Sequence, residues 1–370
     1  MTTQPIRIAI IGTGVIGELH ADVLSRSDDF AVTAVVNRSL PKAEELATRV
    51  ESSGSPRPMV LTDVGDAFEW CDAVSICTPS GAHGELGLQS IMAGKHTMIE
   101  KPIDVSLERA LRIQRAAADR PDVITTVVSQ HRYDPSCEVL FNAVQDGRLG
   151  RLTSGVANLA WWRSQAYYDT ASWRGTWQHD GGGALMNQGI HLLDLMLWMM
   201  GPVATIQAQA ATLAHSGIEV EDTLGATLLF ESGAIGSVLA TTAAYPELSA
   251  RLQVHGARGS AVIDDYRLGY FHTSTEDRTG SRHDSSGGEN LAETEMARYK
   301  GFTGVAMGDS HARQYADFAR GIRDGRQTRV PVAEAVRTLA VIEAIYEAAR
   351  TGRAVSRSGS MGERGAECNR

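Results

Sequence analysis

The most constraining feature of the chain is a glycine pattern that directly follows an apolar run. Residues 6–11 are typical of a buried strand, residues 12–17 read Gly-Thr-Gly-Val-Ile-Gly, and residues 15–25 have a helical pattern. In such a unit the first glycine permits a tight turn, the second lets a pyrophosphate approach the backbone, and the third lets the helix pack on the strand. The helix N-terminus also offers free N–H groups to phosphates. The pattern predicts a dinucleotide site formed by Gly12, Thr13, Gly14, Val15, Ile16 and Gly17.

A glycine-bearing turn without any cofactor is the alternative, and the rhythm of the first third of the chain argues against it. Further strand-like runs occur at 30–36, 73–78, 96–100 and 123–129, and helical patterns lie between them at 41–50, 84–93 and 107–119. Strands that alternate with helices imply right-handed crossovers and a parallel sheet covered on both faces. We therefore predict an α/β fold whose N-terminal part, residues 1–129, is a doubly wound Rossmann sheet.

The rhythm changes after residue 129. Strand-like runs follow one another at 152–162, 203–214, 224–230, 234–242, 250–255 and 260–264, with helical patterns at 184–200, 311–324 and 332–349. Successive strands joined by short turns indicate a largely antiparallel sheet. We expect residues 130–354 to form a C-terminal α/β domain with an open sheet. Residues 273–293 and a tail at 355–370 are polar and are expected to be disordered.

Charge and composition exclude several classes of protein. The formal net charge is −9, whereas a nucleic-acid binder needs a basic face. The four cysteines form no C-x-x-C pair, so we expect reduced thiols and no metal site. The most apolar run, 192–200, is too short to span a bilayer, and no signal peptide is evident at the start. We expect a cytoplasmic protein that binds neither nucleic acid nor membrane.

The end of the second predicted strand bears on the choice of cofactor. Sites that prefer NAD usually place an acidic residue there to bind the ribose 2′-hydroxyl, but this chain has Asn37 followed by Arg38. An amide does not repel a 2′-phosphate, and a guanidinium can hold one. We favour NADP over NAD, while an Arg38 that points to solvent beside a ribose-binding Asn37 would fit NAD.

The carboxyl ends of the other parallel strands should line the same crevice. They add Thr78, Pro79, Ser80, His83, Glu100, Lys101 and Gln130 to the expected cofactor site. Most lysines are solvated surface residues, but Lys101 beside a dinucleotide is a plausible catalytic cation.

Three glycines, 181–183, precede an apolar helical pattern that carries Asn187 and His191. Residues four apart share one helix face, and histidine is the commonest general base, although a histidine on an apolar helix is more often a core residue. Just before the glycines lies an aromatic stretch that suits a sugar ring or, equally, a loop core or subunit contact. The expected substrate residues are Lys101, Arg132, Trp162, Tyr167, Trp173, Arg174, Asn187 and His191.

At this point the residues resemble a known family, the Gfo/Idh/MocA oxidoreductases, over nearly the whole chain. The resemblance rests on the early glycine pattern, on Ala93-Gly94-Lys95-His96 leading to Glu100-Lys101-Pro102, on the glycines leading to Gln188-Gly189-Ile190-His191 and Asp194, and on the helix at 344–349. It implies a Rossmann domain plus an α/β domain whose sheet often forms a subunit interface, and hence a homo-oligomer. It also implies that Lys101 contacts the reacting hydroxyl and that His191 handles the proton.

Many members of the family carry Asp four residues before that histidine, where this chain has Asn187. An amide can orient a substrate by hydrogen bonds but cannot supply a counter-charge. We predict an NAD(P)-dependent dehydrogenase or reductase of a sugar, sugar derivative or inositol, with Lys101, His191 and Asn187 as its catalytic group. A reductase of a non-sugar carbonyl and a catalytically silent dinucleotide-binding regulator are the alternatives.

Overall fold

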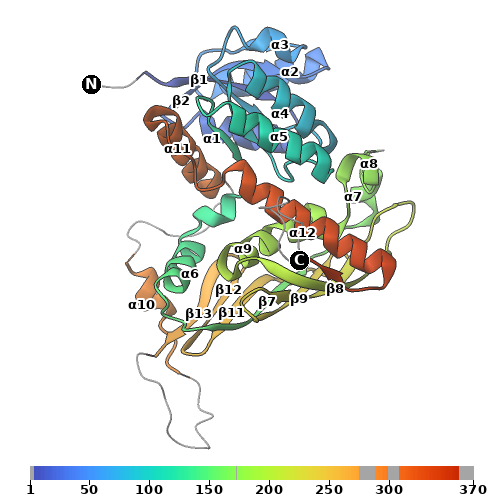
Figure 1. Cartoon of the computed structure of the whole chain (residues 1–370). Helices are drawn as coiled ribbons and strands as arrows, with labels where there is room; N and C mark the ends of the chain where they lie inside the picture. Colours follow the sequence, from blue (N-terminus) through green and yellow to red (C-terminus); the bar gives the residue numbers. More distant parts are fainter. Residues whose placement is uncertain (1–3, 172, 275–287, 299–307, 358–370) are drawn as a thin grey trace, which may run out of the picture.

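A computed structural model of the chain describes residues 4–171, 173–274, 288–298 and 308–357. It contains two sheets in separate layers, with helices on both faces of the first and between the two sheets (Figure 1). The predicted fold class, a Rossmann sheet followed by a mostly antiparallel open sheet, is confirmed.

The first sheet has six parallel strands in the order β3-β2-β1-β4-β5-β6. Their bounds are β1 Ile6–Ile11, β2 Phe30–Val36, β3 Met59–Leu61, β4 Ala73–Ile76, β5 His96–Ile99 and β6 Thr125–Val127. The helices of this half are α1 Val15–Leu24, α2 Leu40–Ser52, α3 Val64–Ala67, α4 His83–Met92 and α5 Leu107–Asp119, with a 3-10 turn η1 at Ser80–Ala82. The strand order reverses between β1 and β4, which is where such sheets bind their ligands.

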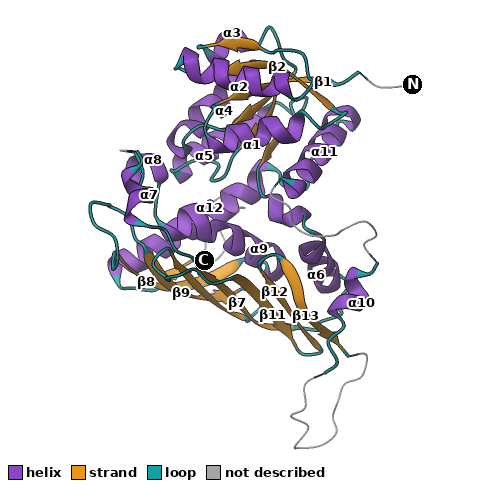
Figure 2. Ribbon diagram, turned by 180° about the vertical axis from the view of Figure 1, so that it is seen from behind, coloured by secondary structure: helices purple, strands orange, loops and turns teal. Residues whose placement is uncertain are grey.

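The second sheet has eight strands in the order β13-β12-β11-β7-β10-β9-β8-β14. Its neighbours pair antiparallel except β7 and β10, which are parallel. The bounds are β7 Leu152–Ala160, β8 Val203–Ala211, β9 Thr223–Phe230, β10 Ile235–Thr241, β11 Ala250–Gly256, β12 Gly259–Asp264, β13 Arg267–Thr273 and β14 Val355–Ser356. Buried and exposed residues alternate along β9 and β10, because helices cover only one face (Figure 2).

The remaining helices lie between the sheets or at the edges. They are α6 Pro135–Gln145, α7 Gln165–Asp169, α8 Trp177–Asp180, α9 Ile190–Met200, α10 Ala292–Met296, α11 Asp309–Asp324 and α12 Val332–Thr351, with a 3-10 turn η2 at Gln130–Tyr133. Helix α11, near the end of the chain, packs against the N-terminal sheet: Tyr315 and Phe318 lie in one core cluster with β1 and β2. Strand β6 also takes a bridge from Pro331. The predicted boundary at 129/130 therefore falls where β6 leads into η2, while α11 packs across it.

Local structure differs from the sequence prediction in several places. The helix predicted at 184–200 begins with a π-helical turn, η3 at Leu185–Gly189, before α9. Strands β3 and β13 and helix α6 were not predicted. Strand β3 has only three residues, whereas α6 has buried residues at 136, 139, 140 and 143, a helical spacing that the sequence prediction overlooked. Residues 355–356, assigned to the tail, pair with β8 as β14. Of the loop predicted at 273–293, residue 273 ends β13 and residues 292–293 begin α10, while residues 275–287 and the rest of the tail lie outside the described residues.

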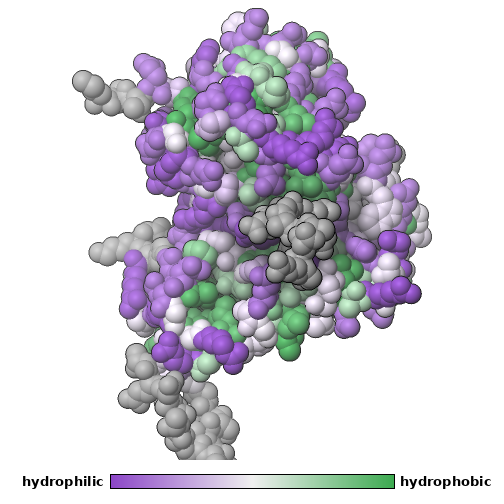
Figure 3. Space-filling view, viewed as in Figure 1, coloured by the Kyte–Doolittle hydropathy of each residue, from purple (hydrophilic) through white to green (hydrophobic). Residues whose placement is uncertain are grey.

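Within the described ranges, no helix is long and apolar enough to cross a membrane. Polar side chains predominate on the face drawn in Figure 3, with apolar patches between them.

Candidate active site

The glycine loop after β1 has the shape that the sequence predicts. Gly12 has a φ of +101°, and a Cβ there would lie 2.6 Å from the carbonyl oxygen of Cys77. A Cβ on Gly17 would lie 2.1 Å from the carbonyl oxygen of Gly12, so helix α1 can pack this closely only with glycine. A Cβ on Gly14 would meet nothing within 4 Å, and Val15 is 80% exposed. The loop thus keeps an open side at the helix N-terminus, which fits a pyrophosphate.

Asn37 and Arg38 lie beside this loop and behave differently. The Asn37 amide donates to Thr13 Oγ1 at 2.6 Å, and its Oδ1 accepts from the Ser39 backbone at 2.8 Å. Arg38 is exposed and has no hydrogen bond or ion pair within the part of the chain that the structure describes. Asn37 therefore braces the loop, and the Arg38 guanidinium is left available to a ligand.

Two buried polar atoms at the expected cofactor site have no partner among the described residues, Thr78 Oγ1 and Gln130 Oε1. Buried polar atoms normally have a hydrogen-bond partner, so these two atoms fit a ligand that would supply one. Nearby, the ring nitrogens of His83 lie 2.8 Å from the Thr78 carbonyl and 2.7 Å from the Pro102 carbonyl. His83 thus ties the loop after β4 to the loop after β5.

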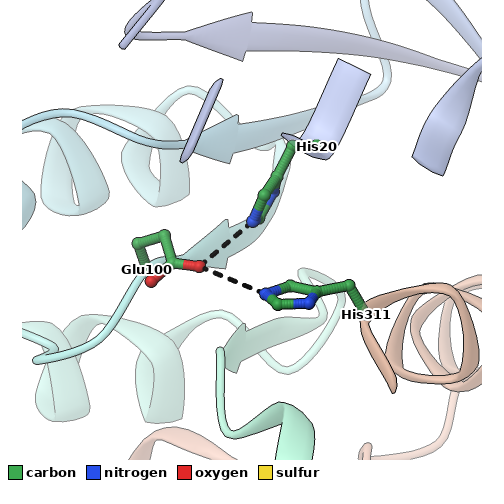
Figure 4. A group of neighbouring side chains, drawn as sticks. All are labelled: His20, Glu100 and His311. Atoms are coloured by element: carbon green, nitrogen blue, oxygen red, sulfur yellow. Dashed lines mark hydrogen bonds and ion pairs between the residues drawn. The ribbon is translucent and has the colours of Figure 1, made fainter. Parts of the chain in front are cut away.

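Glu100 sits in a buried network with two histidines from distant parts of the chain (Figure 4). His20 Nε2 lies 3.0 Å from Glu100 Oε1, His311 Nε2 lies 3.8 Å from the same oxygen, and the Lys101 backbone donates to Oε2 at 2.9 Å. Burial alone would raise the pKa of Glu100, but the two histidines hold it well below its usual value. The ionised carboxylate therefore fixes the backbone of Lys101.

The ligand atoms of this trio all lie within 4.8 Å of one another, a spacing that a metal ion could bridge. The other ring nitrogen of His20 already contacts Tyr315 and Ser75, at 2.7 and 2.9 Å. Since burial lowers the pKa of His20, the ring is neutral: Nε2 donates to Glu100, and Nδ1 accepts from the Ser75 hydroxyl, which in turn accepts from Tyr315. We read the trio as a hydrogen-bond network.

Lys101 and His191 are brought together from the two halves of the chain. Both line one cavity of about 20 Å³, which has room for about one water molecule. Lys101 Nζ donates to the Asn187 carbonyl at 2.9 Å. Burial lowers the pKa of Lys101, against the charges of Glu100 and Asp180. Burial, then the nearby Lys101 and His131, lower the pKa of His191 well below its usual value.

The aromatic stretch forms a compact cluster around Arg174. Its guanidinium lies 4.3 Å from the ring centre of Tyr167 and 4.6 Å from that of Trp173, and it donates to the Tyr167 hydroxyl at 2.7 Å. Burial raises the pKa of Asp180 above its usual value, and the nearby Arg174 opposes this shift. Trp162 packs edge-on against Tyr245, with 5.3 Å between the ring centres.

Comparisons with known proteins agree with this geometry. Residues 6–127 match the family "Oxidoreductase family, NAD-binding Rossmann fold", and residues 137–262 match "GFO/IDH/MocA C-terminal domain". The WlbA dehydrogenase of Chromobacterium violaceum, solved with NADH and UDP-GlcNAcA, is 30% identical, with a TM-score of 0.82 over 96% of this chain and 97% of that one. The chain belongs to the Gfo/Idh/MocA oxidoreductases.

Curated relatives in the family act on different compounds. Levoglucosan dehydrogenase of Pseudarthrobacter phenanthrenivorans is 24% identical over 94% of this chain and 96% of its own. The NADP(+)-dependent scyllo-inositol 2-dehydrogenase of Bacillus subtilis is 24% identical over 95% of both chains. This Gfo/Idh/MocA protein is therefore an NAD(P)-binding oxidoreductase whose relatives include enzymes named for sugars and inositols.

One expected substrate residue lies in the interior instead. Arg132 is 1% exposed and makes two 2.7 Å hydrogen bonds to Asp194, with Glu334 at 3.2 Å. Thr338 and Ser129 also donate to Asp194. Because its donors face these carboxylates, Arg132 is placed to join η2 to α9 and α12, and we do not retain it as a substrate contact.

The structure adds site residues that sequence reasoning missed. His131 stands edge-on to His191 with ring centres 5.1 Å apart, stacks on Tyr266 at 3.4 Å, and contacts Asp134 at 2.7 Å. His20 and Asp180 were missed too. His20 had a sequence signal, since it lies three residues after Gly17 on the buried side of α1, and so did Asp180, which directly precedes the three glycines.

Proposed function

We propose that this protein transfers a hydride between a nicotinamide and a hydroxyl-bearing carbon of a sugar, sugar derivative or inositol. The observation that carries the proposal is the convergence of Lys101 and His191 on one cavity at the carboxyl edge of the Rossmann sheet. When bound, the nicotinamide supplies the acceptor or donor of the hydride. Relatives named for levoglucosan and scyllo-inositol support the substrate class.

In this proposal each residue has a distinct task. His191 is kept neutral by its surroundings and accepts the hydroxyl proton as the carbonyl forms, or returns it in the reverse direction. Lys101 is held by the Asn187 carbonyl and polarises the same oxygen with its ammonium group. The Asn187 carboxamide donates a hydrogen bond to a neighbouring hydroxyl of the substrate or accepts one from it. Tyr167, Trp173 and Arg174 border the substrate, where aromatic faces suit the C–H face of a sugar ring.

We further propose that NADP is used in preference to NAD, with Arg38 as the receptor of the 2′-phosphate. The exposed Arg38 guanidinium, which has no partner among the described residues, supports this assignment, because Arg38 directly follows the amide residue that braces the glycine loop. The named cofactors of relatives differ: NADH is bound to the WlbA dehydrogenase, and NADP(+) is used by the scyllo-inositol enzyme.

A substrate panel tests the proposed function. Purified protein is mixed with free sugars, anhydrosugars, inositols and nucleotide sugars, each with NAD⁺ and with NADP⁺, and the absorbance of reduced nicotinamide is followed. Turnover of one such compound is the expected result. Turnover only of carbonyl compounds that are not sugars would assign a different reductase. Cofactor binding without turnover of anything in either direction would favour a regulatory protein.

A further inference from the structure

A histidine and a carboxylate that have no part in the chemistry proposed for Lys101 and His191 lie directly beside them. His131 belongs to η2, and Asp134 follows this turn and precedes α6. His131 Nδ1 lies 2.7 Å from Oδ2 of the fully buried Asp134. The other Asp134 oxygen accepts from the Ser310 hydroxyl on α11. The carboxylate is therefore held in place and accepts a hydrogen bond from Nδ1 of His131.

Packing fixes the plane of the His131 ring as well. The ring stacks on Tyr266, with 3.4 Å between ring centres, and meets His191 edge-on at 5.1 Å. Asp265 and Tyr266 turn the chain between β12 and β13 with φ of +44° and +60°, left-handed values that residues other than glycine rarely adopt. Such a turn persists only where the surrounding structure holds it. These contacts leave the His131 ring little room to turn.

The contacts of the ring decide what each of its nitrogens does. Burial lowers the pKa of His131, against the hydrogen bond and charge of Asp134, so the ring is neutral at neutral pH. A neutral imidazole has one N–H, which here faces Asp134, and its other nitrogen accepts. Gln130 Nε2 lies 3.3 Å from that accepting nitrogen. The NH₂ group of Gln130 therefore faces His131.

This orientation leaves the oxygen of Gln130 for a ligand. Gln130 Oε1 is buried and has no hydrogen-bond partner among the described residues. An amide that is free to turn offers a ligand either its oxygen or its NH₂, whereas an amide held by His131 offers only the oxygen. A buried acceptor of this kind fits a ligand group that donates a hydrogen bond.

The place of Gln130 indicates which group donates. Gln130 directly follows Ser129, which lines the same cavity as Lys101 and His191. This is the carboxyl edge of the Rossmann sheet, where the cofactor crevice lies. In the proposed function Lys101 and His191 contact the reacting oxygen of the substrate. The carboxamide of the nicotinamide, beside the carbon that gives or takes the hydride, carries an NH₂ donor.

We propose that Asp134 and His131 are positioning residues that hold the Gln130 amide with its oxygen toward the cofactor, where it accepts a hydrogen bond from the nicotinamide carboxamide. Asp134 sets the tautomer of His131, His131 sets the orientation of Gln130, and Gln130 contacts the cofactor. The three residues thereby orient the nicotinamide ring. This inference deepens the proposed function and rests on it for the place of the nicotinamide, but its tests measure binding alone.

The first test compares NAD⁺ with its 3-acetylpyridine analogue, in which an acetyl group replaces the carboxamide and the NH₂ is lost. Isothermal titration calorimetry gives both dissociation constants, or those of the corresponding NADP⁺ pair. We expect the parent to bind NAD⁺ about 5- to 100-fold more tightly, because the analogue leaves the buried Gln130 oxygen unpaired. Gln130→Leu should lose most of this preference. Gln327→Leu, at an exposed position, is the matched control and should keep it.

The second test removes the nitrogens that orient the amide. His131→Phe keeps a ring that can stack on Tyr266, but the Gln130 amide is then free to offer its NH₂ to the acetyl oxygen of the analogue. We expect the analogue to bind more tightly than to the parent, so that the preference for NAD⁺ falls. A merely structural role of His131 would weaken the binding of both ligands equally and would overturn its positioning role.

If His131→Phe does not fold, as circular dichroism would show, the pH dependence of the parent decides. Protonated His131 donates from both nitrogens, so the Gln130 amide must turn its oxygen toward the ring. The preference for NAD⁺ should then fall at a pH below the usual histidine pKa and stay flat in Gln130→Leu. The titratable groups around His131 are Asp134, His191, Tyr266, Lys101 and His311. A preference that does not change with pH in the parent would overturn the positioning role.

A preference that is the same in the parent and in Gln130→Leu overturns the inference as a whole. If the KM of a sugar in the substrate panel rises in that variant instead, the Gln130 oxygen serves a substrate hydroxyl and not the nicotinamide. A preference that is lost in Gln130→Leu, in a protein that turns over nothing in the panel, supports the inference while the proposed function fails.

Discussion

Lys101 and His191 both lie in surroundings that disfavour their charged forms. Burial lowers the pKa of each, and their closeness lowers that of His191 further. The ordinary pKa of a lysine is near 10.4, so this pKa can fall and the side chain still be a charged ammonium at neutral pH. A histidine starts near 6.5, so the same surroundings keep it neutral and able to accept a proton.

Lys101→Ala and His191→Ala should each lower kcat by about 10²- to 10⁴-fold, the usual contribution of a positioned acid–base group. Cofactor affinity, read by NADH fluorescence, should change little. Because both side chains act on one oxygen, the double variant should lose less than the product of the two single losses. If His191→Ala kept nearly the activity of the parent across the pH range, His191 would be a core residue and not the general base.

The pH profile of kcat follows from the same pKa directions. His191 must be neutral to accept a proton, so the acid limb should lie below the usual histidine pKa. Lys101 must be charged, so the basic limb should lie below the usual lysine pKa. Lys101→Arg should move only the basic limb, to higher pH, because arginine stays protonated. An unmoved limb in that variant would mean that another group titrates there.

Arg38→Ala should weaken NADPH binding far more than NADH binding, since only NADPH carries the 2′-phosphate that the guanidinium would hold. Dissociation constants for both cofactors, measured by fluorescence in the parent and the variant, check this. Replacement of Arg57, an exposed arginine paired with Glu51, is the control. Equal affinities of the parent for both cofactors would contradict the preference for NADP.

Among the elements, the π-turn η3 carries Asn187 and helix α9 carries His191. Glu221 binds the backbone where η3 begins. Its Oε2 accepts from the Gly183 backbone at 2.9 Å, and its Oε1 accepts from the Leu185 backbone at 3.0 Å and from the Tyr346 hydroxyl at 2.9 Å. The first N–H groups of a helix have no partner within it, so a buried carboxylate there satisfies them. Glu221 also ties this start to α12.

Glu221→Gln should lower the free energy of unfolding by roughly 1–3 kcal/mol, because the new amide donor faces N–H and O–H groups that need an acceptor. Urea unfolding followed by circular dichroism measures the loss. Glu231→Gln, at an exposed position after β9, should stay within about 0.5 kcal/mol of the parent. Equal stabilities of the two variants would show that Glu221 does not hold this helix start.

For the whole molecule, one face of the eight-stranded sheet is left without a covering helix by the residues that the structure describes. Leu239, Ile235 and Leu229 are 42%, 56% and 44% exposed on β10 and β9. Ile235 and Leu229 are direct cross-strand partners, so they share that face. Apolar residues gathered on one sheet face favour association, and we propose that copies of this chain pair through it.

Light scattering on the parent should then give a mass of two or more chains, and Leu239→Lys should shift it toward one chain. A lysine in the centre of an apolar interface would be buried without a partner. Met92→Lys places the same change on an exposed residue of α4 and should leave the mass unchanged. A monomeric parent would contradict the proposed interface.

Much of the fold was predictable because its signals are local. The glycine pattern needs only its own backbone geometry, as the close contacts at Gly12 and Gly17 illustrate. Apolar runs predicted the strands of both sheets except β3, β13 and β14, and helices α5 and α11 were found to within two residues. The π-turn was not predicted, because packing against its neighbours decides it, and helix α6 was overlooked although its buried residues have a helical spacing.

The sequence by itself determined the dinucleotide loop, the two-sheet fold and the candidates Lys101 and His191, because each depends on residue type and spacing within one segment. Only the tertiary structure decided which charges surround them. Asp180, His20, His131 and His311 come from segments far apart in the chain, and Arg132 lies in a core ion pair with Asp194. Hydrogen bonds and pKa shifts depend on distances of a few ångströms in space. The number of residues between two positions in the chain does not give the distance between their side chains in the folded protein.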